Sequence, residues 1–310
     1  MKKGQFHIKT NSQVLKWARE SLAINRTVAA KELRITINRL DHLEGGTKFP
    51  SLEELKLMSK AYKRTIATLL LSEPLNEKPL PKDCRTVNSS QVGKFHEKTI
   101  LAVRKARALA KSLVDLRQEM NASVQSLDFK SSLSNDPIKV AQDCRRILRI
   151  DELRAIQDMN EALDAYIERI DSFGIAVFQI SLTQDNLRGF SVTDDILPII
   201  VIKKGGEQAT TKIFTLFHEL GHIILNEGGL CDISLTDSAP RIEQWCNAFA
   251  AEILVPSNDL LNNSKVNEYK GRNDRNWAKK DLEQIGKYFH VGPLVILRRL
   301  QASTNYSGIL

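Results

Sequence analysis

A single apolar helix that carries two histidines and a glutamate constrains this chain more than any other stretch of its sequence. Residues 214–225 read Phe-Thr-Leu-Phe-His-Glu-Leu-Gly-His-Ile-Ile-Leu, so apolar side chains surround the polar ones. His218 and His222 are four positions apart, which places them about 40° apart on one face of a helix. Two imidazoles at this spacing can bind one metal ion. Because unpaired polar groups are costly in an apolar interior, the pattern predicts a buried metal site.

The preferences of zinc indicate what else such a site needs. A catalytic zinc takes three protein ligands and keeps one position for water. Glu219 lies beside His218 and can act on that water as a general base. Glu243 is the best candidate for a third ligand, because it begins a second buried helix 21 residues after His222. Asn247 is one turn further along and can orient a ligating histidine. The sequence therefore predicts a Zn²⁺ site formed by His218, His222 and Glu243.

These two blocks resemble the ImmA/IrrE family of bacterial metallopeptidases. The second block runs from Glu243 as Glu-x-x-Cys-Asn-x-Phe-Ala-Ala-Glu-x-Leu-x-Pro, where the family usually has Ala at position 246 and Met at position 255. The resemblance extends over about residues 95–262. It implies a thermolysin-like arrangement with Glu219 as the catalytic base and His218, His222 and Glu243 as zinc ligands. Members of this family often cleave a helix-turn-helix repressor, which switches on stress-response or mobile-element genes.

The positive charge of the chain is concentrated near its N-terminus. The 310 residues carry a net charge of +8, and residues 1–75 hold 14 Lys/Arg against 7 Asp/Glu. The remaining residues hold 31 Lys/Arg and 30 Asp/Glu, which nearly cancel. A basic segment is typical of nucleic-acid binding, although small basic domains often bind none.

Residues 10–72 are predicted to form a bundle of short helices. Thr36 can cap a helix over residues 37–43, and Gly45-Gly46 can end it. Residues 43–55 resemble the Cro/repressor-type helix-turn-helix family just after its recognition helix. That helix would expose Asn38, Arg39, Asp41 and His42, although Asp41 and Glu44 would repel phosphate. The chain departs from this family at Arg34, where a turn glycine is usual, and at Arg26, where a glutamine is usual. The resemblance implies DNA contacts by Arg26, Thr36, Asn38, Arg39 and His42. The alternative is a helical module that docks a protein, such as the repressor substrate.

The rest of the sequence predicts an α+β fold. Residues 73–97 read as a linker that contains three prolines. Helices are expected over residues 98–120, 138–148 and 152–172, and strands over 174–180, 187–192 and 197–202, with Asp194-Asp195 as a hairpin turn. An extended substrate is expected to pair with one of these strands. We predict a zincin-like metallopeptidase domain over residues 98–262, a loop over 257–276, and a helix-turn-helix-like segment over 263–310.

Targeting signals and cysteines indicate a cytoplasmic protein. The N-terminus has no apolar run of the kind found in signal peptides, and the longest apolar stretch is too short to cross a membrane. We therefore expect no membrane partner. The four cysteines form no close pair and read as reduced thiols. A helix-turn-helix domain would also favour a homodimer.

Two functions remain open. The first is a zinc endopeptidase that cleaves a helix-turn-helix repressor. The second is a DNA-binding transcriptional regulator whose zinc site is sensory or structural. A structural zinc usually has four protein ligands, so a fourth ligand such as Cys246 or Cys231 would favour the regulator. Glu219 favours the enzyme, because a structural site has no use for a base.

Three further features are weaker candidates. Arg188 is either a surface residue or a group that binds a substrate carbonyl. His290 is expected to be structural. The loop over residues 230–240 is expected to lie at the mouth of the site as a lid.

Overall fold

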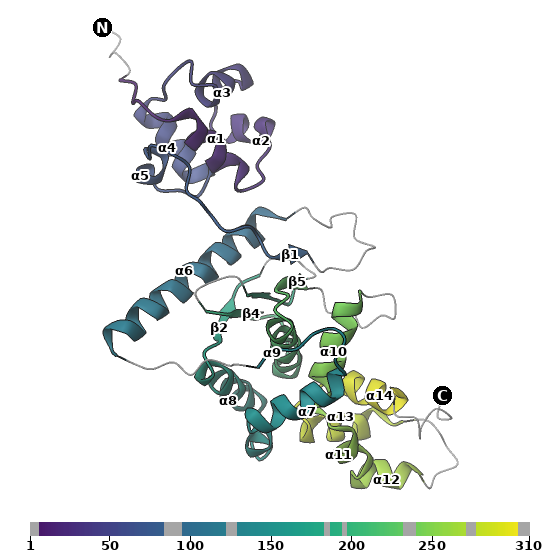
Figure 1. Ribbon diagram of the computed structural model, residues 1–310. Helices are drawn as coiled ribbons and strands as arrows, with labels where there is room; N and C mark the ends of the chain where they lie inside the picture. Colours follow the sequence, from purple (N-terminus) through teal and green to yellow (C-terminus); the bar gives the residue numbers. More distant parts are fainter. Residues whose placement is uncertain are drawn as a thin grey trace. The chain divides into compact units, whose positions relative to one another are not determined.

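The structure is a computed structural model that describes residues 6–83, 95–121, 129–182, 187–193, 197–231, 240–270 and 277–302 (Figure 1). The described residues form two compact units. Unit 1 contains residues 6–80 and 95–101, and unit 2 contains the rest. The expected α+β class is confirmed. None of the described helices is both long enough and apolar enough to cross a membrane.

Unit 1 contains five short helices, which are α1 (Ser12–Glu20), α2 (Arg26–Glu32), α3 (Ile37–Glu44), α4 (Leu52–Ala61) and α5 (Ile66–Leu69). Each begins at a polar side chain that accepts a backbone N–H, and these caps are Asn11, Asn25, Thr36, Ser51 and Thr65. Each cap contributes about 1 kcal/mol. Leu15, Leu40, Leu55 and Tyr62 are among the residues that fill the interior. A helical N-terminal bundle was expected, and the helix-turn-helix motif within it stays a prediction.

Arg34 lies in the turn between α2 and α3, where the helix-turn-helix family usually has glycine. Its φ angle is 56°, which is the left-handed region. A residue with a Cβ atom pays roughly 1–2 kcal/mol to adopt this conformation. The turn therefore has the backbone geometry that favours glycine, although the side chain here is arginine.

A mixed five-stranded sheet lies in unit 2. Its strands are β1 (Lys82–Asp83), β2 (Ala176–Ile180), β3 (Gly189–Val192), β4 (Ile199–Lys203) and β5 (Gly229–Cys231), in the order β1-β5-β3-β4-β2. β2 runs parallel to β4, whereas β3 runs antiparallel to both of its neighbours, β4 and β5. The pairing of β3 with β4 confirms the expected hairpin. The predicted Asp194-Asp195 turn lies outside the described residues.

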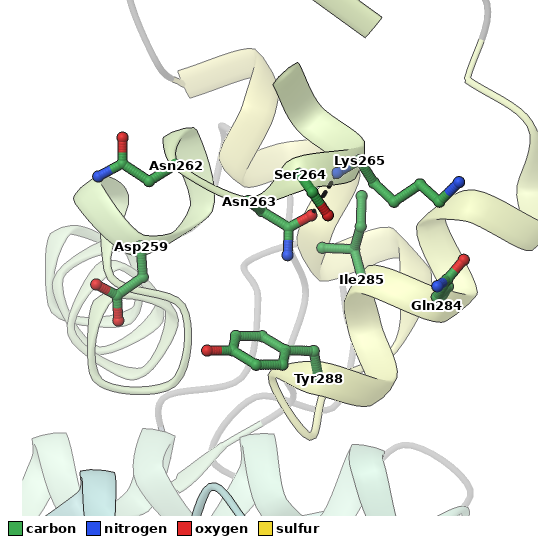
Figure 2. A pocket seen from close by; sticks show the side chains of 8 residues that line it. All are labelled: Asp259, Asn262, Asn263, Ser264, Lys265, Gln284, Ile285 and Tyr288. Atoms are coloured by element: carbon green, nitrogen blue, oxygen red, sulfur yellow. Dashed lines mark hydrogen bonds between the residues drawn. The ribbon is translucent and has the colours of Figure 1, made fainter. Parts of the chain in front are cut away.

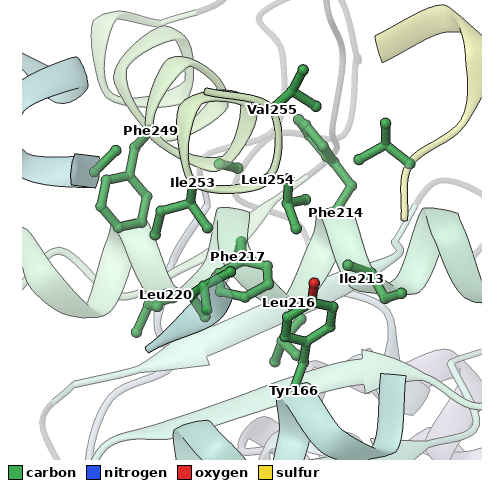
Figure 3. Packing of buried hydrophobic residues seen from close by; sticks show 14 of the residues in the cluster. Tyr166, Ile213, Phe214, Leu216, Phe217, Leu220, Phe249, Ile253, Leu254 and Val255 are labelled. Atoms are coloured by element: carbon green, nitrogen blue, oxygen red, sulfur yellow. The ribbon is translucent and has the colours of Figure 1, made fainter. Parts of the chain in front are cut away.

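One of two buried helices lies against this sheet, and the second packs on the first. Helix α9 (Ala209–Ile224) packs on β3 and β4, and α10 (Arg241–Leu254) packs on α9. Phe217 and Leu220 of α9 share a core with Phe249 and Ile253 of α10 (Figure 3). Tyr166 of α8 (Met159–Ser172) adds an edge-to-face contact with Phe217, with ring centroids 5.2 Å apart. Each large apolar side chain buried in this way contributes about 1.5–3 kcal/mol, so the cluster fixes α9 relative to α10.

The C-terminal end of α10 is capped by arginines from three different elements. Arg145 of α7 (Pro137–Ile147) donates to the carbonyl of Ile253, and Arg154 donates to that of Leu254. Arg299 of α14 (Pro293–Ala302) donates to the carbonyl of Val255 and forms an ion pair with Glu252. The last carbonyls of a helix have no partner within it and carry partial negative charge, so three guanidinium groups stabilise this end.

Two predicted elements differ in the structure. The helix expected over residues 152–172 is split into a 3-10 turn, η1 (Ile150–Leu153), and α8, because Asp158 caps α8 at its own start. The loop expected over residues 257–276 contains α11 (Ser257–Leu261) and α12 (Ser264–Lys270). Leu260 and Val266 of these helices are buried in the core of unit 2, which explains why the segment is ordered into helices.

The C-terminal helices share the core of α9 and α10. Besides α14, they include α13 (Lys279–Tyr288), and they bury Leu282, Ile285, Ile296 and Leu300 in the cluster that holds Phe217 and Phe249. The described part of residues 263–310 therefore has no separate core. The remaining long helix, α6 (Glu97–Glu119), begins within the predicted linker of residues 73–97.

Candidate metal centre

Three predicted ligands come together between α9 and α10. His218 and His222 project from α9, and Glu243 projects from the first turn of α10. Nε2 of His218 lies 3.1 Å from Oε2 of Glu243, and Nε2 of His222 lies 3.3 Å from Oε1. The two Nε2 atoms are 3.3 Å apart. All three side chains are buried. The structure thus brings together residues that are up to 25 positions apart in the sequence.

The spacing of these atoms fits a zinc ion. Ligands about 2.0–2.1 Å from a tetrahedral zinc are separated from one another by about 3.3–3.4 Å. The two imidazole nitrogens are 3.3 Å apart, and each lies 3.1–3.3 Å from one of the two Glu243 oxygens, which is close to this value. The donors are also those that zinc prefers, two imidazole nitrogens and a carboxylate oxygen. In the part of the chain that the structure describes, no other group of His, Cys, Asp or Glu side chains converges in this way.

Each histidine is oriented by an acceptor at its other ring nitrogen. Nδ1 of His218 lies 2.9 Å from Oδ1 of Asn247, and Nδ1 of His222 lies 3.1 Å from the carbonyl oxygen of Glu227. These acceptors favour the tautomer with hydrogen on Nδ1, which leaves Nε2 free to bind a metal. The sequence predicted Asn247. It did not indicate Glu227, because the contact comes from a backbone carbonyl just after α9.

The charges of the centre follow from burial and from the neighbouring groups. Burial alone would raise the pKa of Glu243, but the two imidazoles outweigh it and hold this pKa at about 2. Glu243 is therefore a carboxylate at neutral pH. Burial also lowers the pKa of His218, which favours its neutral form. A neutral imidazole and a charged carboxylate are the forms that bind a metal ion. Burial lowers the pKa of His222 as well, but Cys246 and Glu243 outweigh it and raise this pKa well above its ordinary value, so metal binding would displace a proton from His222.

Glu219 is fully buried in α9, next to His218. Gly189 of β3 lies against it: a Cβ atom on Gly189 would be 3.2 Å from Oε1 of Glu219 and 2.8 Å from Cγ2 of Thr215. The backbone of β3 therefore passes directly over the predicted base. The role of Gly189 was not predicted from the sequence, although a glycine inside a strand often marks a close approach of this kind.

Comparison with protein families bears on this centre. Residues 170–301 match the family model for the IrrE N-terminal-like domain, Peptidase_M78. This part of the chain is an IrrE-like peptidase domain. The match contains Glu219 and all three clustered ligands, and it continues through α13 and α14. The expected family is confirmed for this region. A comparison with curated proteins found no match.

Cys246 lies beside the centre of the IrrE-like domain but outside its cluster of three donors. Its thiol is buried close to His222, and burial raises its pKa to about 11. The thiol is therefore protonated at neutral pH in the metal-free centre. The side chain of Cys231 is not among those the structure describes. The described residues thus offer three ligands, and no cysteine sulfur joins them as a fourth ligand.

Two weaker candidates have other partners. Nε of Arg188 lies 3.5 Å from Oε1 of Glu207, and the arginine side chain is 45% exposed. His290 is buried, with Nδ1 2.9 Å from the Tyr166 hydroxyl and Nε2 2.8 Å from the carbonyl oxygen of Ile156. It links two parts of the core, as expected of a structural residue. Most of the expected lid, residues 232–239, lies outside the described residues.

The predicted DNA contacts are largely engaged within unit 1. Arg39 was expected to be exposed, but its guanidinium donates twice to Glu54 at 2.9 Å and is only 22% exposed. Arg26 forms an ion pair with Asp41. Thr36 caps α3, and His42 shares a hydrogen bond with Thr47. Asn38 remains exposed. The expectation of an exposed Arg39 is therefore wrong, because Glu54 at the start of α4 binds it.

A cavity of about 530 Å³ lies among the C-terminal helices (Figure 2). It is lined by Asp259, Asn262, Asn263, Ser264, Lys265, Gln284, Ile285 and Tyr288. None of these residues belongs to the metal centre, so the cavity does not contribute to its chemistry.

Proposed function

We propose that this chain is a zinc-dependent endopeptidase whose centre is formed by His218, His222, Glu243 and Glu219. The observation that carries the proposal is the convergence of two imidazole nitrogens and the two oxygens of one carboxylate, at 3.1–3.3 Å, beside a buried glutamate. Membership of residues 170–301 in a peptidase family supports the same function.

The roles of the residues follow from their chemistry. His218, His222 and Glu243 would hold the zinc, which when bound supplies Lewis-acid chemistry that activates both water and the scissile carbonyl. Glu219 would accept a proton from the attacking water and pass it to the leaving amine. Asn247 and the carbonyl of Glu227 orient the two imidazoles, so the ligands are held in place before metal binds.

The proposed substrate is a protein, namely a helix-turn-helix repressor whose cleavage derepresses stress-response or mobile-element genes. Unit 1 supports a targeting role, since it is a basic helical bundle attached to the peptidase. The ion pairs of Arg26 and Arg39 favour a module that docks protein over one that reads bases. If unit 1 reads DNA instead, the full chain will prefer one duplex sequence over random duplex at 150 mM salt, about the physiological ionic strength.

The alternative function is a regulator whose zinc is sensory or structural. The cluster of three donors favours the enzyme, because a structural zinc usually has four protein ligands. The test is zinc content and peptide cleavage by purified full-length chains. We expect one zinc per chain in wild type, Glu219→Gln and Cys246→Ala, and none in Glu243→Ala.

Cleavage separates the two functions. Glu219→Gln should retain zinc and lose about 10²–10⁴-fold in kcat, as expected on removal of a general base. Cys246→Ala should cleave like wild type. Loss of zinc in Cys246→Ala would instead indicate a closed site and favour the regulator. A zinc-loaded wild type that cleaves neither unstructured peptides nor the repressor would contradict the peptidase function.

A further inference from the structure

The strand that passes over Glu219 has no open edge at the point of closest approach. Gly189 of β3 pairs with Ile202 of β4 on one side and with Cys231 of β5 on the other. The next residue, Phe190, likewise pairs with both Val201 and Leu230. A strand has only two edges for backbone hydrogen bonding. An extended peptide therefore cannot pair with β3 here while both neighbours are in place.

The outer neighbour is a short segment that follows directly from α9. We call residues 227–231 the strap. Its close fit to β3 depends on Gly228: a Cβ atom there would lie 3.0 Å from the carbonyl oxygen of Ser191 and 3.0 Å from the backbone nitrogen of Thr193. The Gly228 N–H also donates to the Thr193 hydroxyl at 3.4 Å. The strap thus lies along β3 by specific backbone contacts.

The strap is held at its start and along its outer edge. At its start, the Glu227 carbonyl accepts from Nδ1 of His222 at 3.1 Å, which ties it to the metal centre. Along its outer edge, Lys82 and Asp83 of β1 pair with Gly229 and Leu230. Along β3 and β1 the strap is paired through its backbone, and another strand of any sequence can replace such pairing.

We propose that the strap is an autoinhibitory strand, which occupies the substrate edge of β3 and has to leave before an extended peptide can bind beside Glu219. The proposal rests on the peptidase function proposed above. It follows from three observations together: the closeness of Gly189 to Glu219, the pairing of β5 at that same residue, and the exclusion of a Cβ atom at Gly228. An incoming peptide forms the backbone hydrogen bonds that the strap gives up, so the exchange has a small net cost.

The test is a reversible lock between the strap and β3. The register Gly189–Cys231 and Phe190–Leu230 continues to Ser191 opposite Gly229. Opposite residues of antiparallel strands come close enough for a disulfide. The full-length variant Ser191→Cys/Gly229→Cys is loaded with zinc, and binding of two probes is measured before and after oxidation. One probe is an extended peptidyl hydroxamate, and the other is acetohydroxamate, which has the same chelating group without a peptide.

Oxidation should weaken binding of the peptidyl hydroxamate by about tenfold or more, the equivalent of losing one or two hydrogen bonds, and reduction should restore it. Binding of acetohydroxamate and zinc content should not change. The variant Ser191→Cys alone, oxidised in the same way, controls for the four native cysteines.

Other outcomes separate this inference from the peptidase function. Equal peptide binding by the oxidised and reduced variants would overturn the inference, because the peptide would then bind without moving the strap. Failure of the peptidyl hydroxamate to bind the reduced variant more tightly than acetohydroxamate would also overturn it, since β3 would then offer no peptide edge. A third outcome is that binding of the peptidyl hydroxamate depends on the redox state while wild type cleaves no peptide. This would support the autoinhibitory role of the strap and contradict the peptidase function.

Discussion

Gly221 of α9 lies so close to Cys246 of α10 that a Cβ atom on the glycine would be 3.1 Å from the thiol sulfur and 3.3 Å from the Cα atom of Cys246. The neighbouring atoms include backbone, which cannot rotate away as a flexible side chain can. The missing side chain therefore sets how closely the two ligand-bearing helices approach. Because His222 follows Gly221 directly, this contact bears on the metal centre.

Gly221→Ala should lower the free energy of unfolding by about 1–3 kcal/mol, since the added methyl group overpacks the contact with Cys246. Helix propensity alone predicts the opposite sign, a gain of about 0.5–1 kcal/mol. Urea unfolding decides between them. Gly292→Ala is the matched control, because a Cβ atom there has nothing within 4 Å. A Gly221→Ala variant more stable than wild type would show that the helices can move apart freely.

Asn247→Ala should lower zinc affinity by about 10–100-fold, because Nδ1 of His218 loses the acceptor that orients its ring. Asn247→Asp retains an oxygen at the same place and should lose less. Competition with a chromophoric chelator measures both affinities. Identical affinities of wild type and Asn247→Ala would mean that packing alone orients His218.

His290 should make stability depend on pH. Burial lowers its pKa below the ordinary value of about 6.5, and Arg154 lowers it further. The unfolded chain therefore takes up a proton first as the pH falls, so the stability due to neutral His290 is present above about pH 6.5 and is lost below it. Since φ of His290 is 56°, asparagine is the suitable replacement.

The measurement is the difference in unfolding free energy between wild type and His290→Asn at several pH values from 8 to 5. The advantage of wild type should shrink as the pH falls through the histidine range. Other titrating groups, including the metal ligands, are common to both proteins and cancel in the difference. A difference that stays constant with pH would show that His290 has the same pKa in both states.

Glu252→Ala should destabilise the fold by about 3–5 kcal/mol, because it leaves the guanidinium of Arg299 buried without its carboxylate. Glu252 is 1% exposed, and Ser257 donates to it as well. Glu252→Gln keeps the shape and should cost less. Glu283→Ala is the control, since Glu283 forms an exposed pair with Lys279 at 3.7 Å whose loss should cost only about 0.3–0.5 kcal/mol. Similar losses in unfolding free energy for Glu252→Ala and Glu283→Ala would contradict this account.

The sequence allowed prediction of the parts of the centre that local spacing determines. The positions of His218, Glu219 and His222 follow from one helical turn, and Asn247 follows from its distance along the helix that begins near Glu243. The contacts of Gly189 and of the Glu227 carbonyl were missed, because each joins segments whose approach depends on the sheet. Backbone groups and absent side chains leave no periodic pattern in a sequence.

The exposure of Arg39 in unit 1 was wrongly predicted for a similar reason, because it depends on contacts between separate helices. A helix-turn-helix pattern indicates which face of α3 is exposed, but it does not indicate that Glu54 on another helix lies within reach of Arg39. Ion pairs between helices depend on side-chain reach across a packed interface. Turn geometry was easier to anticipate, because Arg34 occupies the left-handed position that the family pattern assigns to glycine.

The arginine cap of α10 joins parts of unit 2 that are made at different times. Its three donors are distant in sequence from the carbonyls they bind, by 108 residues for Arg145, 100 for Arg154 and 44 for Arg299. Such non-local contacts form late, because the loops that they close are long. During synthesis, the helix that carries Glu243 leaves the ribosome before Arg299 does. The cap of α10 is thus completed only after α14 has been made.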